Sequence, residues 1–302
     1  MRVLVTGAAG FVGRWVVAAL QQRGHSVIAV SRSGRPSDDK TSENVAWCSA
    51  DLLRQSDIGS LMHQYQPEGL VHCAWDTTPG SYWTTTANLN WVASSLHLMD
   101  AFARNGGRRA VVAGTSAEYF WDGEDSLHEF RSPTTPDTLY GISKNALRQI
   151  LEQWAPPSDV SLAWGRIFCP FGYDEKPQRL IPRLFQQLRT GLPFPFDSGN
   201  LIRDFLSVED LGDAFAALFD SKVVGPVNLA SGEGVSVRDL VACIAECVGN
   251  RSVTFGVQPD PAGQPRRVVA DVSRLLNEVK WYPRIPVKQR IRETCHYWLA
   301  RP

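Results

Sequence analysis

The fold of this chain is decided by Thr6-Gly7-Ala8-Ala9-Gly10-Phe11-Val12-Gly13, close to its first residue. The apolar run Val3–Val5 before it predicts a buried strand, and a helical pattern follows over residues 11–23. Gly7 permits a tight turn, Gly10 lets the backbone approach a pyrophosphate, and Gly13 allows the helix to pack closely on the strand. The amide groups that open the helix favour an anion. This unit predicts a dinucleotide-binding α/β fold, with five residues of the turn at the cofactor: Gly7, Gly10, Phe11, Val12 and Gly13.

Short apolar runs and helical patterns alternate through the first half of the chain. Strands are predicted at residues 3–5, 27–30, 45–48, 70–74, 110–113 and 161–167, and helices at 11–23, 57–65, 85–104 and 137–154. Such alternation predicts a parallel sheet covered by helices on both faces. After about residue 172 the pattern becomes mixed. We expect a Rossmann-type doubly wound α/β domain over residues 1–172 and a smaller mixed α/β lobe over 173–302, from which the chain returns in part to the first domain.

Composition excludes several classes of protein. Among 302 residues, 31 Lys and Arg balance 31 Asp and Glu, so bulk charge favours neither a nucleic acid nor a membrane as partner. The six cysteines form no Cys-x-x-Cys pair, and the histidines lack metal-ligand spacing. No signal peptide and no membrane-spanning run is predicted. We expect a cytoplasmic protein with reduced thiols and no metal site.

The end of the second predicted strand indicates which dinucleotide the chain binds. A carboxylate at this position would bond the adenosine ribose hydroxyls of NAD, but the chain has Ser31-Arg32, and Arg35 follows. A guanidinium matches a 2′-phosphate in a bidentate manner. We therefore predict NADP(H), with NAD(H) as the alternative and a solvated loop charge as the other interpretation of Arg32. Asp51-Leu52, after the third strand, is predicted at the adenine, and Ala74 near the pyrophosphate.

The residues expected to carry chemistry are Ser116, Tyr140 and Lys144. Tyr140 and Lys144 are four residues apart on a predicted helix and share one face, although such a pair also arises by chance. An ammonium beside a phenol favours the phenolate, so the pair predicts an acid/base device whose lysine also holds the nicotinamide ribose. Ser116 follows the fifth strand, at the sheet edge where ligands bind, and is predicted to bond a substrate oxygen. Thr135 is predicted to cap the helix.

Together these motifs resemble the extended short-chain dehydrogenase/reductase family of nucleotide-sugar enzymes, over essentially the whole chain. The resemblance is carried by the glycine turn, Asp51-Leu52, the Ser116/Tyr140/Lys144 triad, Arg166-Ile167-Phe168, Arg203–Asp210 and Asn228–Gly232. It implies that Ile167 lies at the cofactor and that the second lobe holds the diphosphate of a nucleotide sugar. It further implies a homodimer formed by the helices at 85–104 and 137–154.

The same resemblance suggests which side chains meet the nucleotide sugar. Arg203, together with Arg266 or Arg267, is implied as a diphosphate or ribose contact, and Arg179 lies where the substrate lobe begins. Salt bridges within the lobe are the alternative for these arginines. Trp75, with Tyr82 and Trp83, either shapes the sugar pocket or packs a long loop.

Three reactions of the family compete. Dehydratases of the family carry Thr-Asp-Glu where this chain has Ser116-Ala117-Glu118, and Ala117 cannot donate a proton. Epimerases retain NAD and commonly carry an acid at the position of Ser31, whereas biosynthetic reductases commonly use NADPH. The sequence thus predicts reduction of the C4 keto group of a 4-keto-6-deoxy nucleotide sugar by NADPH, as in deoxysugar biosynthesis. The alternatives are an NAD-dependent 4-epimerase and a non-catalytic NADP(H)-binding sensor or scaffold, which retention of the triad disfavours.

Overall fold

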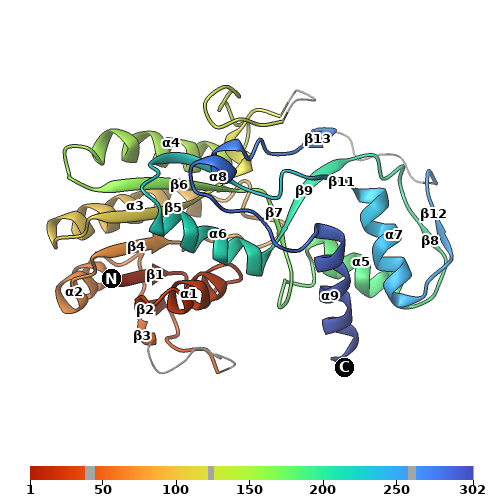
Figure 1. Cartoon of the computed structure of the whole chain (residues 1–302), viewed down its shortest axis with the longest axis horizontal. Helices are drawn as coiled ribbons and strands as arrows, with labels where there is room; N and C mark the ends of the chain where they lie inside the picture. The colour runs from red at the N-terminus through yellow and green to blue at the C-terminus, as the bar shows by residue number, and fades with distance from the viewer. Residues whose placement is uncertain (38–44, 122–125, 258–262, 302) are drawn as a thin grey trace.

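The structure, a computed structural model, describes residues 1–37, 45–121, 126–257 and 263–301, and its central element is a sheet of seven parallel strands (Figure 1). The strands follow the order β10-β6-β5-β4-β1-β2-β3 across the sheet. Their bounds are β1 Arg2–Thr6, β2 Ser26–Ser31, β3 Val45–Ser49, β4 Gly69–His72, β5 Arg109–Thr115, β6 Ser161–Ile167 and β10 Gly225–Leu229. The order reverses at β1, which confirms the predicted doubly wound α/β sheet and puts a ligand crevice at the carboxyl ends of the strands.

Helices cover both faces of the sheet because its strands are apolar on both sides. In β1, Val3 and Val5 belong to one buried cluster and Leu4 to the other, and all three have no exposed surface. The first cluster includes residues of α1 (Gly13–Gln22) and α6 (Val208–Asp220), and the second includes residues of α2 (Gln55–Tyr65), α3 (Ala87–Arg104) and α4 (Leu139–Trp154). Each face therefore has its own hydrophobic core, as a parallel sheet requires.

A smaller lobe lies beside the sheet, as Figure 1 shows. Its strands are β7 Cys169–Phe171, β9 Ile202–Ser207, β11 Gly234–Ser236 and β13 Arg267–Val268 in one sheet, and β8 Phe194–Pro195 with β12 Val253–Thr254 in another. Its helices are α5 Leu180–Leu188, α7 Val237–Val248 and α9 Val287–Leu299, while the short α8 Ser273–Asn277 contacts β10. A third buried cluster joins α5, α7 and α9 to β9. This lobe thus has a core separate from the two cores of the large sheet.

Arg109 joins the start of β5 to a much later part of the chain. Its buried guanidinium donates to the main-chain oxygens of Leu218 at 2.5 Å, Phe219 at 3.1 Å and Val223 at 2.9 Å. These acceptors lie at the end of α6 and in the turn that leads to β10. A charged side chain inside the fold is tolerated here because carbonyl oxygens satisfy it.

Some predicted boundaries differ from the observed ones. α4 begins at Leu139, and its cap is Thr138, whose hydroxyl accepts a hydrogen bond from the Gly141 amide at 3.1 Å. The prediction of Thr135 as the cap was wrong, because the extended backbone at Thr138 puts a second threonine directly before the first helical turn. Similarly, β4 ends at His72, two residues earlier than predicted.

The predictions of no membrane-spanning run and no metal site can be compared only with the residues that the structure describes. There, no helix is both long enough and apolar enough to cross a membrane, and no His, Cys, Asp and Glu cluster could hold a metal ion. All six cysteines are free thiols. The cytoplasmic location stays a prediction.

Candidate active site

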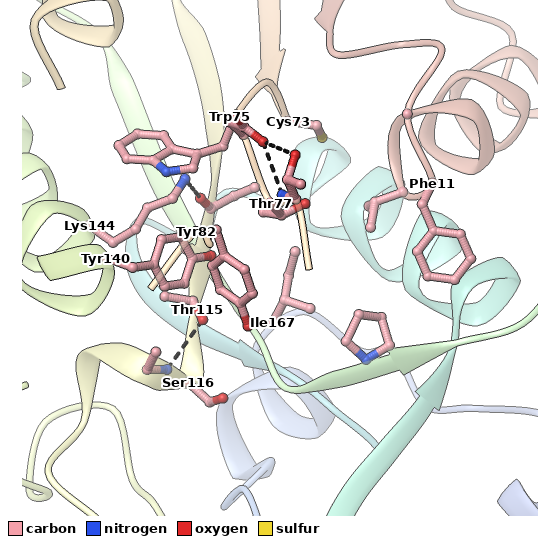
Figure 2. A pocket seen from close by; sticks show the side chains of 18 of the residues that line it. Phe11, Cys73, Trp75, Thr77, Tyr82, Thr115, Ser116, Tyr140, Lys144 and Ile167 are labelled. Atoms are coloured by element: carbon pink, nitrogen blue, oxygen red, sulfur yellow. Dashed lines mark hydrogen bonds between the residues drawn. The ribbon is translucent and has the colours of Figure 1, made fainter. Parts of the chain in front are cut away.

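A large cavity opens between the carboxyl ends of the sheet strands and the smaller lobe. Its volume is about 1090 Å³, and residues that follow β1, β2, β4 and β5 form one wall. The opposite wall comes from β7, β9 and the start of α5, so both parts of the fold contribute to one site. Figure 2 shows labelled side chains of the first wall, such as Phe11, Trp75 and Thr115, around it. A concave site at the switch point of an α/β sheet is the usual place for a ligand in such folds.

The glycine turn has the close approaches that a dinucleotide phosphate site needs. Gly7 has a φ of +67°, and a Cβ on it would lie 2.9 Å from the Ala74 backbone. A Cβ on Gly13 would lie 2.1 Å from the Gly7 oxygen, and the Gly10 amide donates to that same oxygen at 2.8 Å. Backbone and open space therefore occupy the positions that side chains would fill. The residues present fit a phosphate group held at the first turn of α1.

Most of the residues predicted to contact the cofactor line the cavity. They are Gly7, Gly10, Phe11, Val12, Gly13, Ser31, Arg32, Leu52, Ala74 and Ile167, together with Tyr140 and Lys144. Arg35 and Asp51 do not line it, and the Asp51 carboxylate accepts a hydrogen bond from the Leu53 amide at 3.1 Å. A contact of Arg35 or Asp51 with the cofactor stays a prediction.

Lys144 lies buried at the carboxyl end of β5. Its Nζ donates to the Ala113 oxygen at 2.9 Å and lies 3.7 Å from the centroid of the Trp75 ring (Figure 2). Burial lowers the pKa of the ammonium to about 7, against the attraction of the Glu118 carboxylate. Lys144 can therefore change its charge within the physiological pH range.

Tyr140 is enclosed by aromatic rings. The rings of Tyr82 and Trp83 meet it edge-on, with centroids 5.0 and 5.7 Å away, and only 7% of its surface is exposed. Burial raises the pKa of the phenol above its ordinary value, although a side-chain hydrogen bond with Thr115 acts in the opposite direction. The pKa of the phenol is not brought toward neutrality as predicted from the Lys144 charge, because desolvation dominates and the ammonium is engaged by Ala113 and Trp75. At neutral pH the phenol therefore keeps the proton that a donor must supply.

Two hydroxyl side chains follow one another at the end of β5. The predicted Ser116 opens the short helix η1 (Ser116–Glu118) and lines the cavity. Thr115, one residue earlier, also lines it and shares a hydrogen bond with Tyr140. The sequence analysis did not select Thr115, although a second hydroxyl at the end of the same strand was a signal for it.

Glu118 is occupied within the core. Its Oε2 accepts from Arg166 Nε at 2.8 Å, and its Oε1 accepts from Trp164 Nε1 and from the Thr115 amide, each at 2.8 Å. The side chain is fully buried. With both oxygens engaged and Ala117 unable to carry a proton, the pair of acids needed for dehydration is not available at this position.

Some of the arginines predicted to contact the substrate line the cavity, and others do not. Arg179 and Arg203 line the cavity, and Arg203 donates to the Ile202 oxygen at 2.8 Å and to Gln264 at 3.3 Å. Arg266 does not line it, and its main-chain oxygen accepts from the Ile202 amide at 2.8 Å. The contact of Arg266 with a substrate stays a prediction.

Glu175 lines the cavity and was not predicted from the sequence. Its Oε1 lies 3.8 Å from Arg179 Nε, its side chain is 5% exposed, and its Oε2 has no hydrogen-bond partner among the described residues. Burial raises the pKa of this carboxyl to about 8. The polar run Tyr173-Asp174-Glu175-Lys176 is typical of a solvated loop, so the sequence carried no signal for a buried acid here.

The aromatic residues after β4 both pack their loop and shape the site. Trp75, Tyr82 and Trp83 line the cavity, and all three contact Tyr140 through their rings. Trp75 also stacks on Trp91 at a centroid distance of 6.1 Å. The two interpretations offered by the sequence are therefore compatible.

Comparison with known proteins relates the chain to enzymes whose names refer to nucleotide sugars. The chain is 27% identical to UDP-glucose 4-epimerase of Corynebacterium glutamicum, over 94% of this chain and 91% of that protein. It is 29% identical to dTDP-6-deoxy-L-talose 4-dehydrogenase (NAD(+)) of Aggregatibacter actinomycetemcomitans, over 80% and 88%. A solved UDP-glucose 4-epimerase from Stenotrophomonas maltophila, with bound NAD and formylated UDP-arabinopyranose, superposes with a TM-score of 0.84 at 25% identity, covering 99% and 98% of the two chains.

A sequence profile of one protein family also matches most of the chain. The profile describes the NAD dependent epimerase/dehydratase family and matches residues 3–230, which include the glycine turn, the triad and β10. The resemblance to the extended short-chain dehydrogenases/reductases is confirmed, and the protein belongs to the NAD dependent epimerase/dehydratase family of nucleotide-sugar enzymes.

Proposed function

We propose that the protein reduces the C4 keto group of a 4-keto-6-deoxy nucleotide sugar with NADPH. The observation that carries this proposal is the end of β2, where the adenosine ribose of a dinucleotide would lie. Arg32 lines the cavity there, and the neighbouring Ser31 hydroxyl donates to the Gly34 oxygen at 2.6 Å. A guanidinium at the position where an acid would bond the ribose hydroxyls of NAD suits a 2′-phosphate.

The triad has a defined task in this reaction. When bound, NADPH supplies the hydride that reduces the carbonyl carbon. The Tyr140 phenol, neutral because burial raises its pKa, donates its proton to the C4 oxygen. Ser116 and Thr115 orient that oxygen by hydrogen bonds, and the Lys144 ammonium stabilises the negative charge left on Tyr140.

One relative supports chemistry at C4 of a 6-deoxy sugar. The name of the Aggregatibacter protein states a 4-dehydrogenase acting on a dTDP-6-deoxy sugar, and reduction of the corresponding 4-keto compound is the reverse of that reaction. Its stated cofactor is NAD(+), so the preference for NADPH rests on Arg32 alone. Incubation with NADPH or NADH and 4-keto-6-deoxy sugars linked to UDP, GDP, CDP or dTDP tests both points. Loss of absorbance at 340 nm with one of these substrates is expected, and loss with none of them would refute the proposal.

A 4-epimerase is the second candidate, favoured by the match to the Corynebacterium epimerase over 94% of the chain. In that case the purified protein would carry one equivalent of NAD and interconvert a nucleotide sugar with its C4 epimer without added cofactor. We expect neither result for a reductase, which must exchange its cofactor at every turnover.

We also propose that the protein forms a homodimer through α3 and α4. Leu89 on α3 and Ile142 and Ile150 on α4 are 57%, 48% and 47% exposed, an apolar surface that a partner would cover. The double substitution Ile142→Glu with Ile150→Glu should convert a dimer to a monomer in light scattering coupled to size-exclusion chromatography. Leu192→Glu, which changes an exposed leucine of the smaller lobe, should leave the mass unchanged.

A further inference from the structure

Within the described part of the chain, Lys144 has no salt bridge to a carboxylate of the kind that usually accompanies a buried ammonium. Glu118, the acid whose charge acts on Lys144, uses its oxygens for Arg166, Trp164 and the Thr115 amide. Its charge is already offset by the Arg166 guanidinium and by Arg148, whose Nε lies 3.8 Å away. The ammonium therefore needs another source of stabilisation if it is to stay charged inside the protein.

The remaining ionisable groups around Lys144 do not supply a negative charge. His72 is buried at the end of β4. Its pKa is lowered to about 3 by burial and by the Lys144 charge, so its imidazole is neutral. The Cys73 thiol has its pKa raised to about 12 by burial, and Tyr140 on the same helix is also protonated. Lys144 thus faces neutral groups and one acid that is shared with two arginines.

The face of the Trp75 indole ring lies against the Lys144 ammonium, where a counter-charge would otherwise be expected. The Lys144 Nζ lies 3.7 Å from the ring centroid, well inside the range of a cation–π contact, and donates to the Ala113 oxygen at 2.9 Å. The electron-rich ring face attracts the ammonium without needing hydration or a counter-charge. Such contacts are strongest where water is excluded, as it is around this lysine.

The indole ring is itself fixed in orientation. Its Nε1 donates to Asn88 Oδ1 at 2.8 Å, and the amide nitrogen of Asn88 donates to the main-chain oxygens of Tyr82 and Thr85, each at 2.9 Å. Asn88 is 1% exposed, and the Trp91 ring stacks on the Trp75 ring at a centroid distance of 6.1 Å. The ring is thereby held relative to Lys144 by a residue of α3 that does not line the cavity.

We propose that Trp75 is a positioning residue that holds the Lys144 ammonium at the carboxyl end of β5 through the face of its indole ring. This inference rests on the proposed function only in giving Lys144 a task beside Tyr140. The contact itself is a property of the protein without substrate. A tryptophan here acts as the counterpart of the charge, a role distinct from contacting the sugar.

The test measures the protonation of Lys144 directly. The chain has six lysines, so uniform labelling of lysine with ¹³C gives six resolvable side-chain signals, and Lys144→Arg assigns the one in question. Titration from pH 5 to 10 then gives the midpoint for Lys144 in each variant. We expect Trp75→Leu to lower this midpoint by about one pH unit relative to the unmodified protein. Trp75→Phe, which retains a ring face, should lower it by less than half of that.

A matched control separates the contact from a loss of aromatic packing. Trp83→Leu removes an indole of the same loop that packs on Tyr140, 5.7 Å between centroids, and it should leave the Lys144 midpoint unchanged. Equal midpoints for Trp75→Leu and Trp83→Leu would overturn the proposal. If Trp75→Leu does not fold, Asn88→Ala is measured in its place. This variant removes the hydrogen bond to the Trp75 Nε1 but retains the indole ring, and its Lys144 midpoint should fall toward that expected for Trp75→Leu.

A second measurement links the contact to turnover. Where a substrate is found, the basic limb of the pH–rate profile should move to lower pH in Trp75→Leu by the same interval as the NMR midpoint. An unchanged limb with a shifted midpoint would overturn the positioning role while leaving the proposed reaction intact. A protein without turnover on any substrate would refute the proposed reaction, and the NMR titration would still decide for or against the contact.

Discussion

Arg166 and Glu118 form an ion pair inside the protein, with Nε and Oε2 2.8 Å apart and neither residue exposed to solvent. Glu118 also bonds the Thr115 amide, so the pair fixes the backbone that carries both hydroxyls of the site. A carboxylate held in this way serves the structure of the site and is not free to act as a base.

The main effect of Glu118→Gln should therefore be a lower free energy of unfolding. The substitution leaves the Arg166 charge buried without compensation, and we expect a loss of about 3–5 kcal/mol in the free energy of unfolding. Urea unfolding followed by circular dichroism measures it. Asp100→Asn, which breaks the exposed pair with Arg104, should cost about 0–1 kcal/mol. Equal midpoints for the two variants would show that the buried pair contributes nothing special.

Tyr140→Phe should abolish most of the turnover. It removes the proton donor while the ring keeps its contacts with Tyr82 and Trp83, so the rate should fall by about 10²- to 10⁴-fold. Cofactor affinity, measured by fluorescence titration, should stay within about twofold, since the phosphate site lies at the glycine turn. Tyr65→Phe, at the end of α2, serves as the control with unchanged turnover. Full activity in Tyr140→Phe would assign the proton transfer to another group.

Arg32→Ala should weaken NADPH binding selectively. Loss of charge-assisted hydrogen bonds to a 2′-phosphate corresponds to a rise of about 10- to 100-fold in the dissociation constant for NADPH, with that for NADH unchanged. Isothermal titration calorimetry with both cofactors measures this. Arg35→Ala tests the neighbouring arginine, which does not line the cavity, and should have the smaller effect. A parallel loss for both cofactors would remove the argument for NADP(H).

Glu175→Gln should change how stability depends on pH. The folded-state pKa of Glu175 is raised to about 8 from an ordinary value of 4.5, so between these values the folded protein binds a proton that the unfolded chain has released. The free energy of unfolding therefore falls through this window as pH rises. Glutamine cannot ionise, so the melting temperature of the variant should gain on that of the unmodified protein between pH 5 and 8.5. Glu233→Gln, an exposed acid, should show a constant difference, and the same constant difference for Glu175→Gln would contradict the assignment.

Features set by local sequence were predicted well. The glycine turn, the alternation of strands and helices, and the i,i+4 spacing of Tyr140 and Lys144 each express constraints within a few residues, and the sheet and much of the cavity wall follow from them. The cap of α4 was missed because Thr135 and Thr138 are chemically equivalent choices, and only the observed backbone separates them.

Features set by three-dimensional burial were not predictable in the same way. The protonation states of Tyr140 and Lys144 depend on how much water the surrounding rings exclude. Those rings come from a loop that precedes Tyr140 by more than fifty residues in the chain. Glu175 gives the same lesson, because a polar run in the sequence carries no sign that one of its acids is 5% exposed.

The reach of Arg109 has a consequence for how the chain folds. Its guanidinium depends on carbonyl oxygens at residues 218, 219 and 223, and β6 gains its outer neighbour only when β10 arrives at residues 225–229. A nascent chain released as far as residue 172 would carry an unpaired strand edge and an Arg109 guanidinium that has Ser161 but lacks these three carbonyl acceptors. Most of the polypeptide must therefore leave the ribosome before the seven-stranded sheet can be completed, which exposes that edge to aggregation during synthesis.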